Sequence, residues 1–314
     1  MFEFERFCLD HNIPTTTQHH HCSSGWIASH CPFCGSMNFH LGYNPYGQYF
    51  NCWKCGSHSV YEFVAKVTHS SKGRVKEILK TYCDTSAPLV RRRKSKRIGT
   101  VLKPPSGLGP LRDNHRRYLM KRGFDPDELE FMYHLKGIGP ISGPGWKHRL
   151  MIPIIHEGEV VTYQGRDVTG RSDIRYKSMR TEDSLMDIKS TLYGYDNLEG
   201  LNFAVVVEGP VDVWRLGPGA VATFGTEFTL SQAKMLRKQK IVYIMYDNSA
   251  KDPNAQRQAK KLAALIRSIG TFAVSKEPGA CDPGELSPYD ARTLMNNLRE
   301  SAGSLYNKLK EDNQ

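Results

Sequence analysis

The sequence predicts a multidomain protein, in which a small β-rich module with many cysteines is joined by a basic linker to an α/β domain containing a parallel sheet. Two closely spaced cysteine pairs lie within the first 60 residues. Six basic residues among seven, followed by a stretch rich in proline and glycine, separate this part from the rest, as is typical of a linker. From Phe203 onward, strand-like runs alternate with helix-like runs. That alternation is typical of a parallel sheet with helices packed on it.

The length and composition are those of a globular protein. A chain of 314 residues with 39% hydrophobic and 24% charged residues has room for two ordinary domains and a small third. This excludes a disordered, collagen-like or coiled-coil chain. The longest apolar runs, such as Leu150–Ile155, are far shorter than the roughly 20 residues that span a bilayer, and the acidic N-terminus does not resemble a signal peptide. We expect no membrane segment and a cytoplasmic location.

The chain is basic, with 43 lysine and arginine residues against 32 acidic residues and a net charge of +11 at pH 7. Such an excess suits a polyanionic partner such as nucleic acid, although many basic soluble proteins have none. The densest basic run is Arg91–Arg97, and the proline- and glycine-rich stretch Lys103–Pro110 follows it. This segment is either a solvated tether or a strip that contacts backbone phosphates, and the two roles are compatible.

The cysteine pairs predict a metal site. Cys31-Pro-Phe-Cys34 and Cys52-Trp-Lys-Cys55 are separated by seventeen residues. In a reducing cytoplasm, paired thiols of this spacing favour metal over disulfides, and four thiolates complete the tetrahedron that structural Zn2+ prefers. Gly35 and Gly56 follow the pairs directly, where a tight turn needs a residue without a Cβ. We expect a zinc ribbon holding one structural Zn2+, with no coordination position open for catalysis.

Aromatic side chains crowd the segment between and within the cysteine pairs. Some are expected to pack on the metal core, and the others to lie on an exposed sheet face, where rings can stack on unpaired bases. These residues are Phe39, Tyr43, Tyr46, Tyr49, Phe50 and Trp53.

The elements after the ribbon follow from periodicity and turn signals. A helix is expected from Val60 to Val67, and another over Arg116–Arg122 that ends at Gly123. Leu150–Arg166 predicts a two-stranded hairpin. The strands of the parallel sheet are expected at Phe203–Val207, Ala220–Phe224, Ile241–Tyr246 and Thr271–Ser275. The helices are expected at Val211–Leu216, Leu230–Lys238, Asn254–Ile269 and, fraying at the end, 290–314.

Carboxylates follow three of these strands. Glu208 and Asp247 come at the ends of their strands, and Asp282 follows the last strand in Asp282-Pro283-Gly284. Because parallel strands end at one edge of a sheet, the three side chains can converge there. Such a cluster binds hard divalent cations such as Mg2+. Taken singly, each is as easily a helix cap or a solvated loop residue.

These motifs resemble a known family. The segments Glu208-Gly-Pro-Val-Asp212, Ala222-Thr-Phe-Gly-Thr226, Tyr246-Asp247 and Asp282-Pro283 are similar to the Toprim domain, which bacterial-type DNA primases share with topoisomerases. Three further features select bacterial and phage-type primases. The cysteine pairs with His40-Leu41-Gly42 between them resemble the primase zinc-binding domain, and Tyr118-Leu-Met-Lys-Arg-Gly123 resembles the opening of the RNA polymerase domain. The basic region before Toprim is matched by His148–Pro153, Gln164–Arg166, Arg175–Lys177 and Leu192–Gly194.

The resemblance implies a domain order and roles for single residues. The expected order is a zinc-binding domain at 1–87, a basic linker at 88–110, the basic N-terminal subdomain of the RNA polymerase domain at 111–200, a Toprim (Rossmann-like) subdomain at 201–285 and a C-terminal helical segment at 286–314. Toprim residues Glu208, Asp247 and Asp282 would bind catalytic Mg2+ or Mn2+, with Asp252 as a further candidate. The basic subdomain would hold the nucleoside triphosphate and the template–RNA hybrid through Arg122, Arg149, Arg166, Arg175 and Lys177.

We therefore predict a DNA primase of phage type, a DNA-directed RNA polymerase that makes short RNA primers on single-stranded DNA from ribonucleoside triphosphates, in the cytoplasm of a bacterial host. The family usually has Asp-x-Asp after the second strand, where this chain has Asp247-Asn248-Ser249. That departure favours the alternative, a catalytically degenerate, primase-like protein that binds single-stranded DNA. The sequence contains no G-x4-G-K-[ST] loop, so we expect the replicative helicase to be a separate chain.

Overall fold

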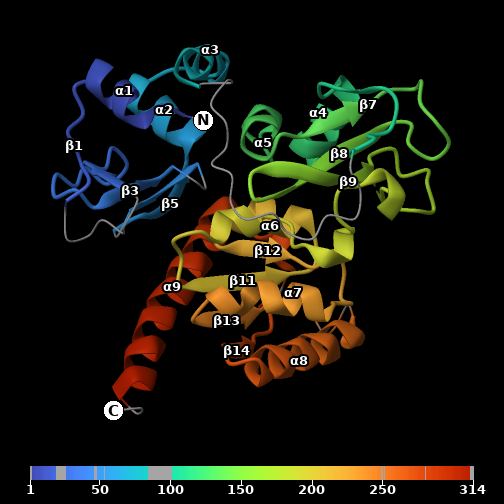
Figure 1. Cartoon of the computed structure of the whole chain (residues 1–314). Coiled ribbons are helices and arrows are strands. Elements are labelled where there is room, and N and C mark those ends of the chain that lie inside the picture. The colour runs from blue at the N-terminus through green and yellow to red at the C-terminus, as the bar shows by residue number, and fades with distance from the viewer. Residues whose placement is uncertain are drawn as a thin grey trace. The chain divides into compact units, whose positions relative to one another are not determined.

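The computed structural model describes residues 2–18, 26–45, 48–52, 54–83, 101–248, 250, 252–279 and 281–311 (Figure 1). Outside these residues lie the predictions made for Tyr46, Trp53, Ser249 and the basic run Arg91–Arg97. The chain divides into two compact units, and each combines segments that are distant in the sequence. The first unit is Met1–Asn12 with Ser59–Ile188, and the second is Ile13–His58 with Lys189–Gln314.

The first unit contains three helices that pack through apolar side chains. They are α1 (Phe4–Asp10), α2 (Val60–Thr68) and α3 (Lys72–Tyr82). The rings of Phe4 and Phe7 lie 5.6 and 5.9 Å from the ring of Phe63. The helix predicted after the second cysteine pair is α2. It begins with a capping box, in which the Ser59 hydroxyl accepts from the Glu62 N–H and the Glu62 carboxylate accepts from the Ser59 N–H.

The first unit also contains a five-stranded antiparallel sheet in the order β10-β9-β8-β7-β6. Its centre is the predicted hairpin, now seen as β8 (Arg149–His156) paired with β9 (Glu159–Asp167). Glu157 and Gly158 have φ angles of 52° and 77°. Positive φ at both positions is the backbone of a two-residue type I′ turn, so the hairpin prediction is confirmed. The other elements are β6 (Leu108–Gly109), β7 (Lys136–Ile138), β10 (Tyr176–Ser178), α4 (Asp113–Lys121) and α5 (Pro126–Tyr133).

The second unit contains the cysteine-rich ribbon, whose five strands neighbour one another in sequence order. Among the described aromatic residues noted in the sequence, Tyr43, Tyr49 and Phe50 are buried and Phe39 is half-buried. Tyr43 and Phe50 are partners on adjacent strands, with ring centres 4.9 Å apart. These rings therefore form the core of the ribbon. The strands are β1 (Thr15–Thr16), β2 (Ile27–Ser29), β3 (Leu41–Asn44), β4 (Tyr49–Cys52) and β5 (Gly56–Ser59).

The predicted parallel sheet lies in the second unit and has the strand order β12-β11-β13-β14. All three pairings are parallel, which confirms the predicted fold class. The second strand along the chain ends two residues earlier than expected, because Phe224 has a φ of 61°, which no regular strand accommodates. The strands are β11 (Phe203–Val207), β12 (Ala220–Ala222), β13 (Ile241–Ile244) and β14 (Phe272–Ser275).

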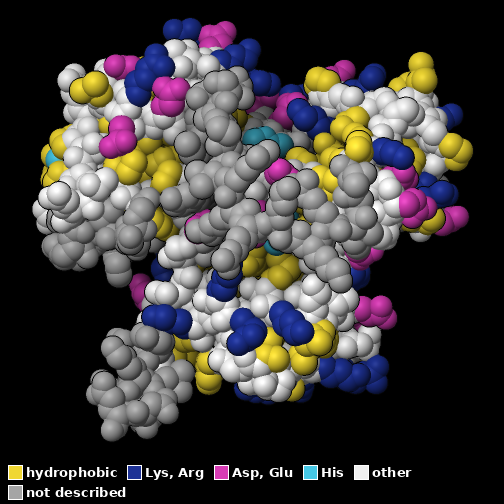
Figure 2. All heavy atoms as spheres, in the orientation of Figure 1, with side chains coloured by type: hydrophobic (Ala, Val, Ile, Leu, Met, Phe, Trp, Pro, Cys, Tyr) yellow, Lys and Arg dark blue, Asp and Glu magenta, His cyan; other side chains and the backbone are white. Residues whose placement is uncertain are grey.

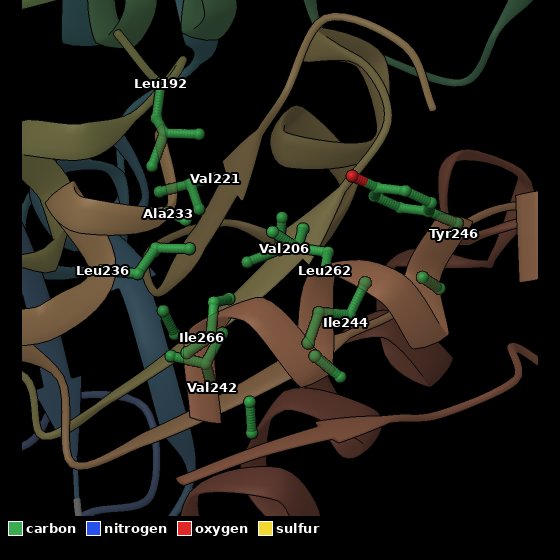
Figure 3. Close-up of a cluster of buried hydrophobic side chains, with 14 of the residues drawn as sticks. Leu192, Val206, Val221, Ala233, Leu236, Val242, Ile244, Tyr246, Leu262 and Ile266 are labelled. Atoms are coloured by element: carbon green, nitrogen blue, oxygen red, sulfur yellow. The ribbon is translucent and has the colours of Figure 1, made fainter. Parts of the chain in front are cut away.

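Helices cover both faces of the parallel sheet. One face packs on α7 (Leu230–Met235), the short helix η4 (Leu236–Lys238) and α8 (Pro253–Ser268). Figure 3 shows this core, in which Val206 and Ile244 of the strands meet Leu236 and Leu262 of the helices. On the other face, α6 (Pro210–Leu216) packs against α9 (Pro288–Glu311), and Arg299 of α9 lies 5.7 Å from the ring centre of Phe203.

Direct contacts join the ribbon to the parallel-sheet part of the second unit. The Asn44 side chain donates to the Glu199 carbonyl at 2.8 Å, and a Cβ on Gly56 would lie 2.5 Å from the Asn296 side chain. These contacts fix the ribbon against the parallel-sheet part of the unit. No helix among the described residues is long and apolar enough to cross a membrane. The other short helices are η1 (Thr181–Asp183), η2 (Ile188–Ser190), η3 (Tyr195–Leu198) and η5 (Pro283–Glu285).

Candidate functional site

The four cysteines of the ribbon lie together. Their sulfur atoms are all within 4.8 Å of one another, with 3.5 Å between those of Cys31 and Cys55 and 3.7 Å between those of Cys34 and Cys52. Thiolates at these distances can surround one tetrahedral Zn2+, whose bonds to sulfur are about 2.3 Å long. The donor set fits the predicted structural zinc. In the part of the chain that the structure describes, no other set of three or more His, Cys, Asp or Glu side chains is as compact.

The backbone around the pairs explains why the sulfur atoms converge. Gly35 and Gly56 have φ angles of 68° and 89°, which side chains with a Cβ rarely adopt. The Cys31 N–H donates to the Ser36 carbonyl at 2.9 Å and closes the first turn. Hydrogen bonding with the Cys52 thiol raises the pKa of Cys31 to about 12. A bound metal ion is what allows four adjacent sulfur atoms to be thiolates together.

His58 is a polar group beside this cluster that sequence reasoning did not single out. Its Nε2 lies 3.2 Å from the Cys55 sulfur, and its ring stacks on Phe33 with 3.6 Å between ring centres and 4° between planes. Burial lowers the pKa of His58 to about 4, so the ring is neutral at physiological pH. In the tautomer protonated at Nε2 it donates to the Cys55 sulfur. Side chains that hydrogen-bond to a metal ligand without binding the metal themselves orient that ligand.

The predicted acidic residues lie at the carboxyl edge of the parallel sheet. Glu208 directly follows β11, and Asp247 comes three residues after β13, which is the neighbouring strand. The Asp247 N–H donates to Glu208 Oε1 at 3.0 Å. The N–H of the next residue, Asn248, donates to Asp282 Oδ1 at 2.9 Å. Two successive peptide groups therefore hold the three carboxylates at one edge.

Asp212 is a fourth carboxylate of this edge, and it links two loops. It occupies the first turn of α6, where its Oδ2 accepts from the Gly209 N–H at 2.9 Å. Its other oxygen lies against Gly284, where an added Cβ would come within 2.5 Å. Asp212 thereby joins the turn after Glu208 to the turn after Asp282. The sequence signal for it was present, since an acidic residue at the third position of a helix commonly accepts from the N-cap N–H.

The electrostatics of this edge favour a cation. Burial, followed by repulsion from Asp247, raises the pKa of Asp212 to about 7. Burial also raises the pKa of Glu208 to about 7, and the charges of Asp247, Asp212 and Asp252 add to the shift. A divalent cation would offset the repulsion between these carboxylates when they ionise. Mg2+ prefers oxygen donors of this kind. Asp252 is the N-cap of α8, and its carboxylate accepts from the Asn254 N–H at 2.9 Å.

Arg149, expected to contact nucleotide, instead has its side chain inside the first unit. It is 2% exposed, and burial lowers its pKa. Its guanidinium donates to the carbonyls of Gly145, Gly165 and Ile174 at 2.6, 3.0 and 2.9 Å and to the Ser172 hydroxyl at 3.0 Å. This placement makes Arg149 a positioning residue that holds two loops to the sheet.

The other predicted cations are nearer the surface. Arg166 lies between two rings, 4.6 Å from the centre of Tyr176 and 5.6 Å from that of Tyr118. Lys177, on the strand paired with Arg166's strand, lies 4.9 Å from the ring centre of Trp146 and donates to the Pro144 carbonyl at 2.9 Å. Arg175 is exposed just before that strand, and Arg122 is the C-cap of α4. The β9–β10 register sets Arg166 opposite Tyr176, so the side chains of Arg175 and Lys177, the neighbours of Tyr176, project from the other face of the sheet.

The carboxyl edge of the parallel sheet that carries Glu208, Asp212, Asp247 and Asp282 is called the acidic edge below. Lys189 supports this edge from a neighbouring loop. Its ammonium donates to the carbonyls of Thr223, Phe224 and Glu227 at 3.0, 3.1 and 2.8 Å. The same loop reaches the site through the Gly225 N–H, which donates to the Glu208 carbonyl at 2.8 Å. Lys189 therefore stabilises the loop that follows β12.

Comparisons with known proteins agree with this geometry. Residues 205–287 match the family described as Toprim-like. A comparison with curated proteins gives no match. Among solved structures, the Aquifex aeolicus primase with its zinc-binding and RNA polymerase domains is 20% identical, with a TM-score of 0.50 over 95% of this chain and 83% of that chain. A DNA primase domain from Pseudomonas aeruginosa is 21% identical, with a TM-score of 0.48 over 56% of this chain and 68% of that chain. The protein thus contains a Toprim-like domain within the fold of a bacterial primase that has zinc-binding and RNA polymerase domains.

Proposed function

We propose that the protein is a DNA primase of phage type, a nucleotidyltransferase that makes short RNA primers on single-stranded DNA for replication. The observation that carries the proposal is the pair Glu208 and Asp247, which are joined at neighbouring strand ends of a Toprim-like domain. The fold likeness to the Aquifex aeolicus primase supports the same function.

The proposed chemistry is phosphoryl transfer between ribonucleoside triphosphates and the growing primer. Mg2+ or Mn2+, when bound, would neutralise charge on the transferred phosphates. Glu208, Asp247 and Asp282 would hold the cation, while Asp212 fixes the two loops that present them. The remaining contribution of the chain is positioning. We expect Arg166, on one face of the β9–β10 pair, and Lys177, on the other, to meet phosphate groups of the nucleotide or template separately.

Two partners complete the proposal. We propose that the single-stranded template binds the zinc ribbon and the basic subdomain, and that the replicative helicase is the second partner. The setting would be the cytoplasm of a bacterial host. The net charge of +11 supports the nucleic-acid partner.

A second candidate function follows from the Asp247-Asn248-Ser249 segment. A serine hydroxyl offsets less cationic charge than the carboxylate usual in the family at that position. The chain would then be a non-catalytic module that holds single-stranded DNA on a primase scaffold.

An assay of labelled primer synthesis distinguishes the catalytic function from the binding function. It uses single-stranded DNA, ribonucleotides and either Mg2+ or Mn2+. We expect primers from the wild type and a loss of at least about 100-fold in Glu208→Gln, because a metal ligand is removed. The matched control is Glu300→Gln, an exposed acidic residue of α9, which should keep full activity. If the wild type binds single-stranded DNA but makes no primers with either metal, and Ser249→Asp restores synthesis, the catalytic proposal is wrong and the binding module is the function.

A further inference from the structure

Two helices of the second unit present a cluster of exposed basic residues, which we call the α7–α8 basic face. Neither 230–240 nor 253–269 contains an acidic residue. The face therefore carries eight positive charges with no acidic residue among them, in a chain whose net charge is +11. They are Lys234, Arg237, Lys238 and Lys240 on α7, η4 and the next turn, and Arg257, Lys260, Lys261 and Arg267 on α8.

The cations share one outer surface because their helices share one core. Ala233 of α7 and Ala259 and Leu262 of α8 are buried against the same side of the parallel sheet. At about 100° per residue, Arg257, Lys260 and Lys261 lie on the side of α8 away from these apolar residues, and Arg267 lies on its flank. In the lower part of Figure 2, where Figure 1 places α7 and α8, most charged side chains are lysine or arginine.

These charges have little local compensation. Lys240 aside, none of the eight forms an ion pair with a described residue. Arg257 and Arg267 use one nitrogen each to donate to the Asn254 side chain and the Ala273 carbonyl. By contrast, Lys72 of α3 pairs with Asp125 at 2.6 Å. A face of uncompensated cations attracts a polyanion.

The composition of the face indicates which polyanion. Neither segment contains an aromatic residue, so it lacks the rings on which sites for single strands stack unpaired bases. A surface with basic side chains and no aromatic rings can bind the phosphates of a duplex, which carries one negative charge per about 1.7 Å of its axis. The face also begins at the acidic edge. Gln256 donates to the Asp247 carbonyl at 3.1 Å, Arg257 is the next residue, and Arg267 lies about 15 Å further along α8.

We propose that the α7–α8 basic face binds the phosphate backbone of a nucleic-acid duplex that leads away from the acidic edge, independently of base sequence. The inference rests on the proposed function in taking the polyanion to be nucleic acid. The binding itself requires neither nucleotide nor divalent metal.

The test compares two full-length variants with the same reduction of charge. The face variant combines Lys234→Gln, Arg237→Gln, Lys260→Gln and Lys261→Gln. The control combines four exposed cations elsewhere, Lys66→Gln, Arg74→Gln, Lys80→Gln and Lys276→Gln. Glutamine has nearly the helix propensity of lysine and arginine, and circular dichroism checks the fold. Fluorescence anisotropy then follows binding to two blunt DNA duplexes of unrelated sequence, over a range of salt concentrations without added Mg2+ or Mn2+.

The face variant should bind both duplexes more weakly to the same extent. Its salt dependence should be shallower by about 0.9 for each phosphate that is no longer neutralised, or about 3 to 4 in total, and the control should change by less than about 1. Equal slopes for the two variants would overturn the proposal. So would a face variant that keeps duplex binding and no longer binds polyglutamate, since the partner would then be an acidic protein. Because no Mg2+ or Mn2+ is present, this outcome is independent of whether the chain makes primers.

Discussion

The acidic edge should make the metal-free protein less stable as the pH rises. The pKa of Asp212 is raised from 3.8 to about 7 in the folded protein, first by burial and then by Asp247. A carboxyl group whose pKa is higher in the folded state binds its proton more tightly there. Its contribution to the free energy of unfolding is therefore fully present below pH 3.8 and is lost as the pH rises toward 7. This direction is opposite to that of a salt-bridged carboxylate.

The size of the effect follows from the shift. A change of about three pH units, at 1.36 kcal/mol per unit, corresponds to at most about 4 kcal/mol. Because the Asp212 residue is only partly buried, we expect about half of this, or about 2 kcal/mol, between pH 4 and pH 8. A divalent cation at 100 times its dissociation constant should add about 2.7 kcal/mol. It should do so at pH 8 and have little effect at pH 5, where protons compete for the same oxygens.

The assay is urea unfolding of the wild type and Asp212→Asn at both pH values, with and without added Mg2+. Trp214 is a local probe, since it is 6% exposed, lies two residues from Asp212 and donates to the Tyr193 hydroxyl at 2.7 Å. Asparagine has the same shape but cannot ionise, so the variant should lose about 2 kcal/mol of pH dependence in the absence of Mg2+. The reasoning is refuted if the two proteins show the same pH dependence, or if Mg2+ stabilises the wild type as strongly at pH 5 as at pH 8.

Two further residues give predictions of the same kind. His58→Phe should keep the stacking on Phe33 and remove the N–H beside Cys55. Zinc affinity, measured by competition with a chelator, should therefore fall about 10- to 100-fold. An unchanged affinity would mean that His58 has a packing role only. Arg149→Lys removes most of the donors that hold the two loops, and calorimetry should show a loss of about 2 to 4 kcal/mol in the free energy of unfolding, whereas the exposed Arg175→Lys should show none.

The sequence was sufficient where chemistry and periodicity act locally. The parallel sheet was predictable because Phe203–Val207 and Ile241–Ile244 are unbroken apolar runs, as expected for strands covered on both faces. The thiol cluster was predictable from its spacing alone. The direction of a long side chain was not predictable. The acceptors of Arg149 belong to loops at 145 and 172–174 and to Gly165 of β9. These segments meet only in the folded sheet, so the charge of Arg149 could not be assigned to the interior beforehand.

The departure at Ser249 has a restricted consequence because the acidic edge is assembled by the main chain. Asn248, the residue between Asp247 and Ser249, donates its N–H to Asp282 and its side-chain amide to the Gly279 carbonyl at 2.7 Å. These bonds join the loop after β13 to the loop before η5. The main-chain N–H groups of Asp247 and Asn248 therefore hold the carboxylates of Glu208 and Asp282 at the edge. With one carboxylate fewer, mutual repulsion at the edge is weaker and so is its attraction for a divalent cation. Metal affinity, rather than the fold of the site, is the property that a serine at this position should alter.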